Sequence, residues 1–143
     1  MINTIEVKLD KDLGAVMPTK AHDTDAGYDL YSPVDVIVLA RGTAFIVTGV
    51  HMFIKSGKAG LIISKSGLNK NFSITSTGLV DAEYTGSIGV KLYNFSDEEY
   101  EVKKGDKISQ IVILDINSPN LREVEEFTRS AERGNNGFGS SGR

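Results

Sequence analysis

The sequence predicts a single all-β domain built as a β-sandwich, jelly roll or barrel. Short apolar runs follow the two-residue period of half-buried strands. Clusters of Gly, Pro, Asn, Ser and Asp separate these runs at short intervals, as turns do. The chain has 143 residues, of which 40% are hydrophobic and 24% charged, so it is long enough for one buried core and too short for two ordinary domains.

The strand pattern begins at the N-terminus, where Ile5, Val7 and Leu9 alternate with Glu6 and Lys8. Further runs typical of strands cover residues 34–39, 45–54, 61–63, 88–92, 99–102 and 108–114. Helix signals are scarce. The pattern predicts one helical turn over residues 66–71, with Ser66 as its N-cap.

Composition excludes several classes of function. The net charge is −3, from 16 basic and 19 acidic side chains, so no overall positive field attracts nucleic acid or an anionic membrane, and we expect neither as a partner. The chain has no cysteine, which excludes disulfides and thiol catalysis. A zinc site would have only His22 and His51 as nitrogen ligands, which disfavours one.

The sequence also lacks targeting features. Its apolar runs, such as residues 36–40, are far too short to cross a bilayer. The N-terminus has no basic region followed by an apolar stretch, so we see no signal peptide. A cytoplasmic location is therefore expected.

The last eleven residues differ from the rest of the chain. Residues 133–143 read RGNNGFGSSGR, with four glycines and Phe138 as the one apolar side chain. Such a segment cannot bury enough surface to order itself. It is either a floppy tail or a flap that orders on a ligand, because glycine backbone, an arginine fork and an aromatic face all suit a nucleotide. Composition leaves both interpretations open.

Five segments combine glycine with polar groups in an apolar frame. They are AGYDL at 26–30, SKSGL at 64–68, GLVDAEYTG at 78–86, GDKISQ at 105–110, and the tail. Singly, each is an ordinary turn or cap sequence. A phosphate-binding P-loop is excluded, because Gly57 and Lys58 are followed by Ala59 and the first glycine of that motif is replaced by Met52.

Taken together, in this order and spacing, the five segments resemble the motifs of the trimeric dUTPases, from residue 26 to the C-terminus. The resemblance implies a jelly-roll-like β-barrel with one short helix, assembled as a homotrimer with exchange of C-terminal arms. It implies a barrel domain over 1–132 and an arm over 133–143 that closes a neighbouring active site. It also implies Mg²⁺-dependent hydrolysis of dUTP to dUMP and pyrophosphate, in the cytoplasm or, for a phage or viral member, the host cytoplasm.

The third segment carries the implied catalytic and base-binding residues. In the family, the aspartate that matches Asp81 handles the water that attacks the α-phosphorus. The ring that matches Tyr84 lies under the sugar and excludes a ribose 2′-hydroxyl. The backbone at Leu79, Val80 and Gly89 would form a slot that reads uracil, and it would refuse cytosine because buried groups would be left unpaired.

Phosphate and metal contacts are implied for other segments. Lys65, Ser66, Gly67 and Gln110 would contact the phosphate chain. Lys65 departs from the family, whose usual residue there is arginine, so the charge is kept and the bidentate fork is lost. Asp29 would hold a water of the Mg²⁺ ion, since this ion keeps several waters and binds mainly to the phosphates.

The arm supplies the remaining implied contacts. Arg133 would clamp the γ-phosphate, and Phe138 would stack on the uracil ring. Gly139, Ser140 and Ser141 would close over the phosphates and exclude water other than the nucleophile.

Two alternatives remain. A dCTP deaminase shares the fold and similar motifs, but its strand glutamate is replaced here by Lys91, which cannot shuttle protons as a carboxylate does. A non-catalytic β-barrel that binds a protein partner would use the glycine motifs only as turns. The joint presence of Asp81, Tyr84, Arg133 and Phe138 argues against that second alternative.

Overall fold

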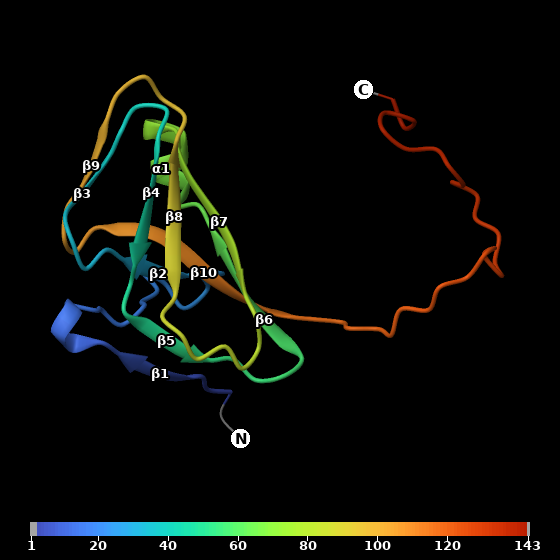
Figure 1. Ribbon diagram of the computed structural model, residues 1–143, viewed down its shortest axis with the longest axis horizontal. Coiled ribbons are helices and arrows are strands. Elements are labelled where there is room, and N and C mark those ends of the chain that lie inside the picture. Colours follow the sequence, from blue (N-terminus) through green and yellow to red (C-terminus); the bar gives the residue numbers. More distant parts are fainter. Residues whose placement is uncertain (1–2, 143) are drawn as a thin grey trace.

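The computed structural model describes residues 3–142. Figure 1 shows a strand-rich barrel with one short helix and a long C-terminal arm. The elements are β1 (Glu6–Leu9), a 3-10 turn η1 (Lys11–Leu13), β2 (Tyr28–Tyr31), β3 (Val36–Val38), β4 (Thr43–Val47), β5 (Val50–Phe53), β6 (Lys58–Ile63), α1 (Ser66–Phe72), β7 (Ile74–Val80), β8 (Gly89–Asn94), β9 (Tyr100–Val102) and β10 (Lys107–Asp115).

The strands form three antiparallel sheets. The largest has six strands in the order β2-β10-β6-β7-β8-β4, and β1 pairs with β5 and β3 with β9. The six-stranded sheet curls round the core. In its hydrogen-bonding order, β2 and β4 are the two end strands. The predicted all-β, jelly-roll-like barrel with one short helix is confirmed.

The core is made of inward-facing aliphatic side chains from most strands. Strand β8 illustrates the rule, because Val90 and Leu92 are fully buried while Lys91 between them is exposed. This alternation follows from the strand period. The largest fully buried side chains are Leu30, Ile46, Ile54, Ile74, Ile88, Leu92, Ile108 and Ile111.

The run over 45–54 is interrupted, so its residues belong to two strands, β4 and β5. Gly49 has a φ of 73°, a left-handed conformation that a strand does not tolerate and that glycine adopts without strain. The Thr48 hydroxyl donates to the carbonyl of Ile88 at 2.7 Å and accepts from the Val50 N–H at 3.2 Å. The backbone bonds from Thr48 N–H to Ile88 O and from Ile88 N–H to Val50 O persist, and the Thr48 hydroxyl supplies the acceptor for the Val50 N–H at the break.

The predicted N-cap is wrong by one residue. Lys65 occupies the cap position with an extended backbone, and Ser66 is the first residue of α1; no side-chain hydrogen bond caps the helix. Helix α1 ends at Phe72, because Ser73 follows in the left-handed conformation with a φ of 55°.

The C-terminal segment that ends in the predicted arm leaves the sheet after β10. Residues 116–142 contain no helix or strand, and the segment leads away from the barrel (Figure 1). The division of the chain at residue 133 stays a prediction. Over residues 3–142, no helix is both long and apolar enough for a membrane span.

Candidate active site

A pocket of about 340 Å³ opens where β7 and β8 diverge. These strands pair only from Ile74 to Ser76, opposite Leu92 to Asn94. Beyond that point, β7 continues on β6 and β8 pairs with β4. The side of β7 that faces the opening therefore has no β8 ladder partner over residues 77–80. Main-chain groups at such an opening can read the edge of a flat ring.

The pocket gathers the residues predicted for catalysis and for reading the base and sugar. Leu79 and Val80 end β7, Asp81 follows them, Tyr84 lies in the next turn and Gly89 begins β8; all five line the pocket. Asp81 is exposed, which leaves its carboxylate accessible to water and substrate.

Tyr84 is held at the pocket's edge by its own loop. Its hydroxyl donates to the carbonyl of Ser87 at 3.1 Å. A Cβ added at Gly86 would lie 2.3 Å from that hydroxyl oxygen, so the ring fits only because residue 86 is glycine. The ring remains 48% exposed, which leaves a face free to contact a sugar.

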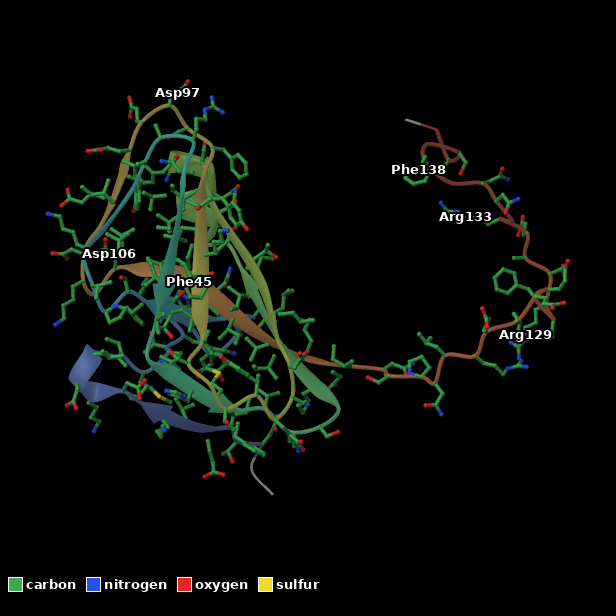
Figure 2. The ribbon with its side chains drawn as sticks, viewed as in Figure 1. Phe45, Asp97, Asp106, Arg129, Arg133 and Phe138 are labelled. Atoms are coloured by element: carbon green, nitrogen blue, oxygen red, sulfur yellow. The ribbon has the colours of Figure 1, made fainter. Side chains whose placement is uncertain are left out.

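Sequence reasoning missed Phe45. Its ring projects from β4 and lines the same pocket. Figure 2 labels Phe45 on the barrel. A Cβ at Gly89 would lie 2.1 Å from the Phe45 ring, so the ring in this position packs directly against the backbone of Gly89. No motif marks Phe45. It reaches the pocket because β4 pairs with β8, with Val47 opposite Gly89.

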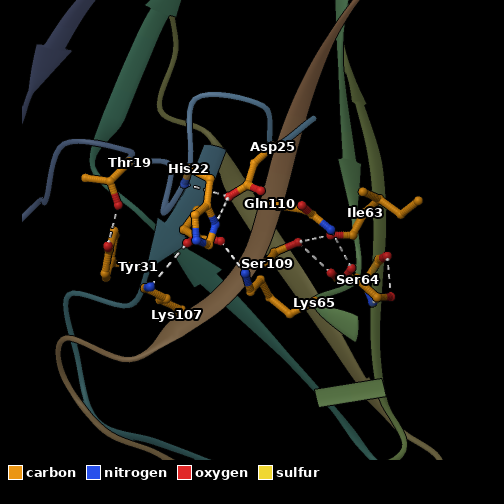
Figure 3. Close-up of polar contacts among 12 residues, drawn as sticks. Thr19, His22, Asp25, Tyr31, Ile63, Ser64, Lys65, Lys107, Ser109 and Gln110 are labelled. Carbon is orange, nitrogen blue, oxygen red and sulfur yellow. Dashed lines mark hydrogen bonds and ion pairs between the residues drawn. The ribbon is translucent and has the colours of Figure 1, made fainter. Parts of the chain in front are cut away.

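A second group of predicted residues surrounds Asp29 on β2. This carboxylate is nearly buried and forms ion pairs with Lys65 through Oδ1 and with Lys107 through Oδ2, the latter at 3.3 Å. Figure 3 shows Lys65 and Lys107 approaching from different segments. Sequence analysis missed Lys107, which reaches Asp29 because β10 pairs with β2. Two ammonium groups around one carboxylate leave a net positive charge.

Gln110 lies in the interior of the large sheet, because β10 runs between β2 and β6. Its Nε2 donates to the carbonyl of Ser64 at 3.0 Å. A Cβ at Gly27 would lie 2.5 Å from Gln110 Oε1, so this glycine admits the side chain. Gln110 therefore fixes the strand that leads to Lys65.

Ser66 and Gly67 are exposed at the start of α1, and a Cβ at Gly67 would meet nothing within 4 Å. Their backbone N–H groups belong to the first turn of the helix, where they lack intrahelical acceptors. This surface is open to an anion next to Lys65.

A bound Mg²⁺ would find few protein ligands. Within residues 3–142, no cluster of three or more His, Cys, Asp or Glu side chains could hold a metal ion. Asp29 fits a water-mediated role, because its oxygens already accept from two lysines and a direct metal bond would displace one of them. A carboxylate oxygen can accept a further hydrogen bond from a metal-bound water.

The arm carries its predicted residues away from the barrel. Figure 2 shows Arg133 and Phe138 at a distance from the strands. Arg133 donates from Nε to the carbonyl of Asn136 at 2.7 Å, and Phe138 is fully exposed. Gly139, Ser140 and Ser141 form exposed turns, in which the N–H of Ser140 donates to Gly137 O at 3.1 Å.

The predicted residues thus form three groups on one chain. The hairpin pocket around Asp81 has neither Lys65 nor Gln110 among its lining residues, and the arm extends away from both groups. A pocket with a carboxylate at its edge lies on the same barrel as a separate cationic group around Lys65 and Lys107. This arrangement suits a protein whose ligand combines a flat ring with an anionic chain.

Comparison with known proteins gives the family. The dUTPase family model matches residues 14–142. The chain is 43% identical over 129 residues to the deoxyuridine 5'-triphosphate nucleotidohydrolase of Arabidopsis thaliana, covering 90% of this chain and 77% of that protein. This chain belongs to the dUTPase family, and the resemblance seen in its motifs is confirmed.

Solved structures agree. The dUTPase of Staphylococcus bacteriophage 80alpha with dUPNHPP is 35% identical, with a TM-score of 0.93, covering 99% of this chain and all of that one. A mutant dUTPase of phage phi11 of S. aureus, described with a structural Mg(II) ion, is 32% identical, with a TM-score of 0.82, covering 89% of this chain and all of that one.

Proposed function

We propose that this chain hydrolyses dUTP to dUMP and pyrophosphate, which limits uracil incorporation into DNA and supplies dUMP for dTTP synthesis. The observation that carries the proposal is the pocket between β7 and β8, with Asp81 at its edge. Relatives named for this activity and the analogue-bound phage structure support it.

Uracil is read in the pocket by main-chain groups of Leu79, Val80 and Gly89. A narrow slot refuses cytosine, because its 4-amino group presents a donor where uracil has an acceptor and leaves buried groups unpaired. Tyr84 lies at the pocket edge, where its exposed face contacts the deoxyribose and leaves no room for a 2′-hydroxyl.

Asp81 acts on the nucleophile. Its carboxylate accepts a hydrogen bond from a water and orients it toward the α-phosphorus, and it takes the proton as the water attacks. The bond from the α-phosphorus to the bridging oxygen breaks, and pyrophosphate leaves. An aspartate at this position could also be an ordinary turn residue with no catalytic role. The position of Asp81 in the lining of the pocket argues for the catalytic role.

The cationic group binds the phosphate chain. Lys65 and the backbone N–H groups of Ser66 and Gly67 face the anion, and Gln110 donates to a phosphate oxygen. Lys65 acts as a point charge, since a lysine has no bidentate fork. Bound Mg²⁺ would lower the negative charge of the triphosphate, and Asp29 would hold one of its waters.

The complete site needs several copies of the chain. One subunit of a homotrimer supplies the hairpin pocket, a neighbour supplies the phosphate-binding group, and a third supplies the arm. The separation of these groups on one chain supports this assembly. In the closed site, Arg133 contacts the γ-phosphate and Phe138 stacks on the base, while Gly139, Ser140 and Ser141 cover the phosphates. A cytoplasmic location stays a prediction.

A substrate panel tests the proposal. The purified chain is incubated with Mg²⁺ and each of dUTP, dCTP, dTTP and UTP, and pyrophosphate and released ammonia are measured. We expect pyrophosphate from dUTP alone. Ammonia from dCTP would establish the deaminase instead, and no turnover of any nucleotide would support a binding protein. Light scattering on the same sample tests the trimer.

A further inference from the structure

The active-site loop, residues 81–88, is fastened to the neighbouring segment 48–54. Several of its attachments are hydrogen bonds that do not depend on pH. They are the Glu83 N–H to Ile54 O at 2.8 Å, the Ile88 N–H to Val50 O at 2.8 Å, and the Gly49 N–H to Ser87 Oγ at 3.0 Å. The loop that holds Asp81 and Tyr84 is therefore positioned largely from this segment.

His51 makes one further attachment, through a ring that titrates. Its Nδ1 lies 2.7 Å from the carbonyl oxygen of Thr85, the residue directly after Tyr84. Its Nε2 lies 2.8 Å from Oδ2 of Asp10. The ring is partly buried, with 17% of the side chain exposed. His51 thus bridges the active-site loop and the end of β1.

Both partners of the ring are acceptors. A neutral imidazole has one N–H and can donate to only one of them, whereas the imidazolium donates to both. The Asp10 carboxylate, by its hydrogen bond, raises the pKa of His51 above the ordinary histidine value, and the Thr85 carbonyl acts in the same direction. The geometry and the charge therefore both favour the protonated ring.

The other charged groups near this ring come from β1. Lys8 lies opposite His51 in the β1-β5 ladder and lowers the pKa of His51 by repulsion. Glu6 lines the same shallow surface pocket as His51 and Thr85. Asp10 stands at the N-cap position of η1, yet its side chain makes no cap bond there. The Asp10 carboxylate instead forms its hydrogen bond with His51.

We propose that protonated His51 is a positioning residue that clamps the active-site loop through the Thr85 carbonyl, so that substrate binding and sugar selection weaken as the ring loses its proton. The role of the loop in this statement rests on the proposed function. When the ring is neutral, it has a single N–H, and the charged Asp10 carboxylate, as the stronger acceptor, keeps that bond. The Thr85 carbonyl beside Tyr84 then loses its donor. The loop then relaxes at the position that carries the Tyr84 ring.

Proton NMR titration of the whole protein tests the clamp without any substrate. The chain has two histidines, and His22 is an exposed loop residue that serves as the internal reference. We expect His51 to titrate above the ordinary histidine value of about 6.5, with both ring nitrogens protonated below that transition. Asp10→Asn should shift the His51 transition to lower pH and leave His22 in place. A His51 transition at or below the ordinary histidine value, or no response of His51 to Asp10→Asn, would overturn the clamp.

Kinetics over about pH 5.5 to 9 test its consequence. In the wild type, KM for dUTP should rise about fivefold as the pH passes the His51 transition, with kcat changed less, since one charge-assisted hydrogen bond is lost. His51→Gln should show the raised KM at every pH, and His22→Gln should follow the wild type. If His51→Gln does not fold, Asp10→Asn must move the KM transition to lower pH.

These experiments can refute dUTP hydrolysis and the His51 clamp independently of each other. A wild type that fails to hydrolyse dUTP refutes the proposed function, while the NMR titration still decides whether the clamp exists. An active wild type whose KM profile is shared by His51→Gln refutes the positioning role alone.

Discussion

The Lys65 ammonium and the Asp29 carboxylate form an ion pair that joins the start of α1 to β2 across 36 residues of sequence. Lys107 contacts the other oxygen of the same carboxylate at 3.3 Å. The carboxylate side chain is 7% exposed, Lys65 28% and Lys107 47%. The buried negative charge therefore has one well-shielded partner and one that solvent screens.

This difference predicts unequal effects of removing each lysine. Lys65→Met should lower the free energy of unfolding by about 1–2 kcal/mol, because the buried carboxylate loses its main partner. Lys107→Met should cost less than about 1 kcal/mol, as exposed ion pairs do. Urea unfolding at one protomer concentration measures both. Equal losses would show that the two lysines support Asp29 alike.

Asp81→Asn tests the catalytic carboxylate. The amide keeps the shape of the side chain and cannot take the proton of the attacking water, so kcat should fall at least about a hundredfold. Affinity for a non-hydrolysable dUTP analogue, measured by calorimetry, should stay close to that of the wild type. Near-normal turnover would remove Asp81 from the mechanism.

Tyr84→Ala tests sugar selection. Removing the ring opens space next to the pocket, so the ratio of kcat/KM for dUTP over UTP should fall. Tyr84→Phe is the matched control, since it keeps the ring and loses only the hydroxyl bond to Ser87. It should keep most of the discrimination. An unchanged ratio in Tyr84→Ala would assign sugar selection to other residues.

Strands with one buried face were predictable, and strands of mixed polarity were not. Strand β8 alternates cleanly because one face packs on the core. Strand β7 was missed, since its sequence contains Ser76 and Gly78. The Ser76 hydroxyl is buried only because it meets the Ser109 hydroxyl at 2.6 Å, on a strand 33 residues away. No local pattern indicates such a partner.

The residues of the candidate site also fall into a group that the sequence predicted and a group that it did not. Motif spacing led to Asp81, Tyr84 and the glycines around them, because those residues are close in sequence. Phe45 and Lys107 join the site through pairing of distant strands, β4 with β8 and β10 with β2. The register of such pairs depends on the whole sheet, so residues contributed across it are visible only in the structure.

Removal of residues 133–143 tests the arm. Residues 133–142, the part of this segment that the structure describes, belong to none of the barrel sheets, so the truncated chain should keep its assembly and its thermal unfolding midpoint. Its hydrolysis of dUTP should fall sharply, because the phosphates stay open to solvent and lose Arg133. Light scattering, calorimetry and a pyrophosphate assay on one preparation measure these quantities. A truncated chain that keeps the full rate would exclude closure by the arm.

The raised pKa of His51 predicts that stability falls as the pH rises above the ordinary histidine value and through the higher pKa of the folded state. The folded state binds the proton more tightly than the unfolded chain, whose histidine pKa is about 6.5. The stabilisation from His51 is therefore fully present below that value and is lost as the pH passes the higher, folded pKa.

Urea midpoints of the wild type and His51→Gln, compared from about pH 5.5 to 9, measure this contribution. The difference should be largest at the acidic end and should shrink with rising pH. Exposed Asp25 does not interfere, because the backbone N–H of His22 lowers its pKa below 3.8, and its stabilisation is lost only as the pH falls through that range. A difference that grew with pH would mean that folding favours the neutral ring, which would contradict the two-acceptor geometry around His51.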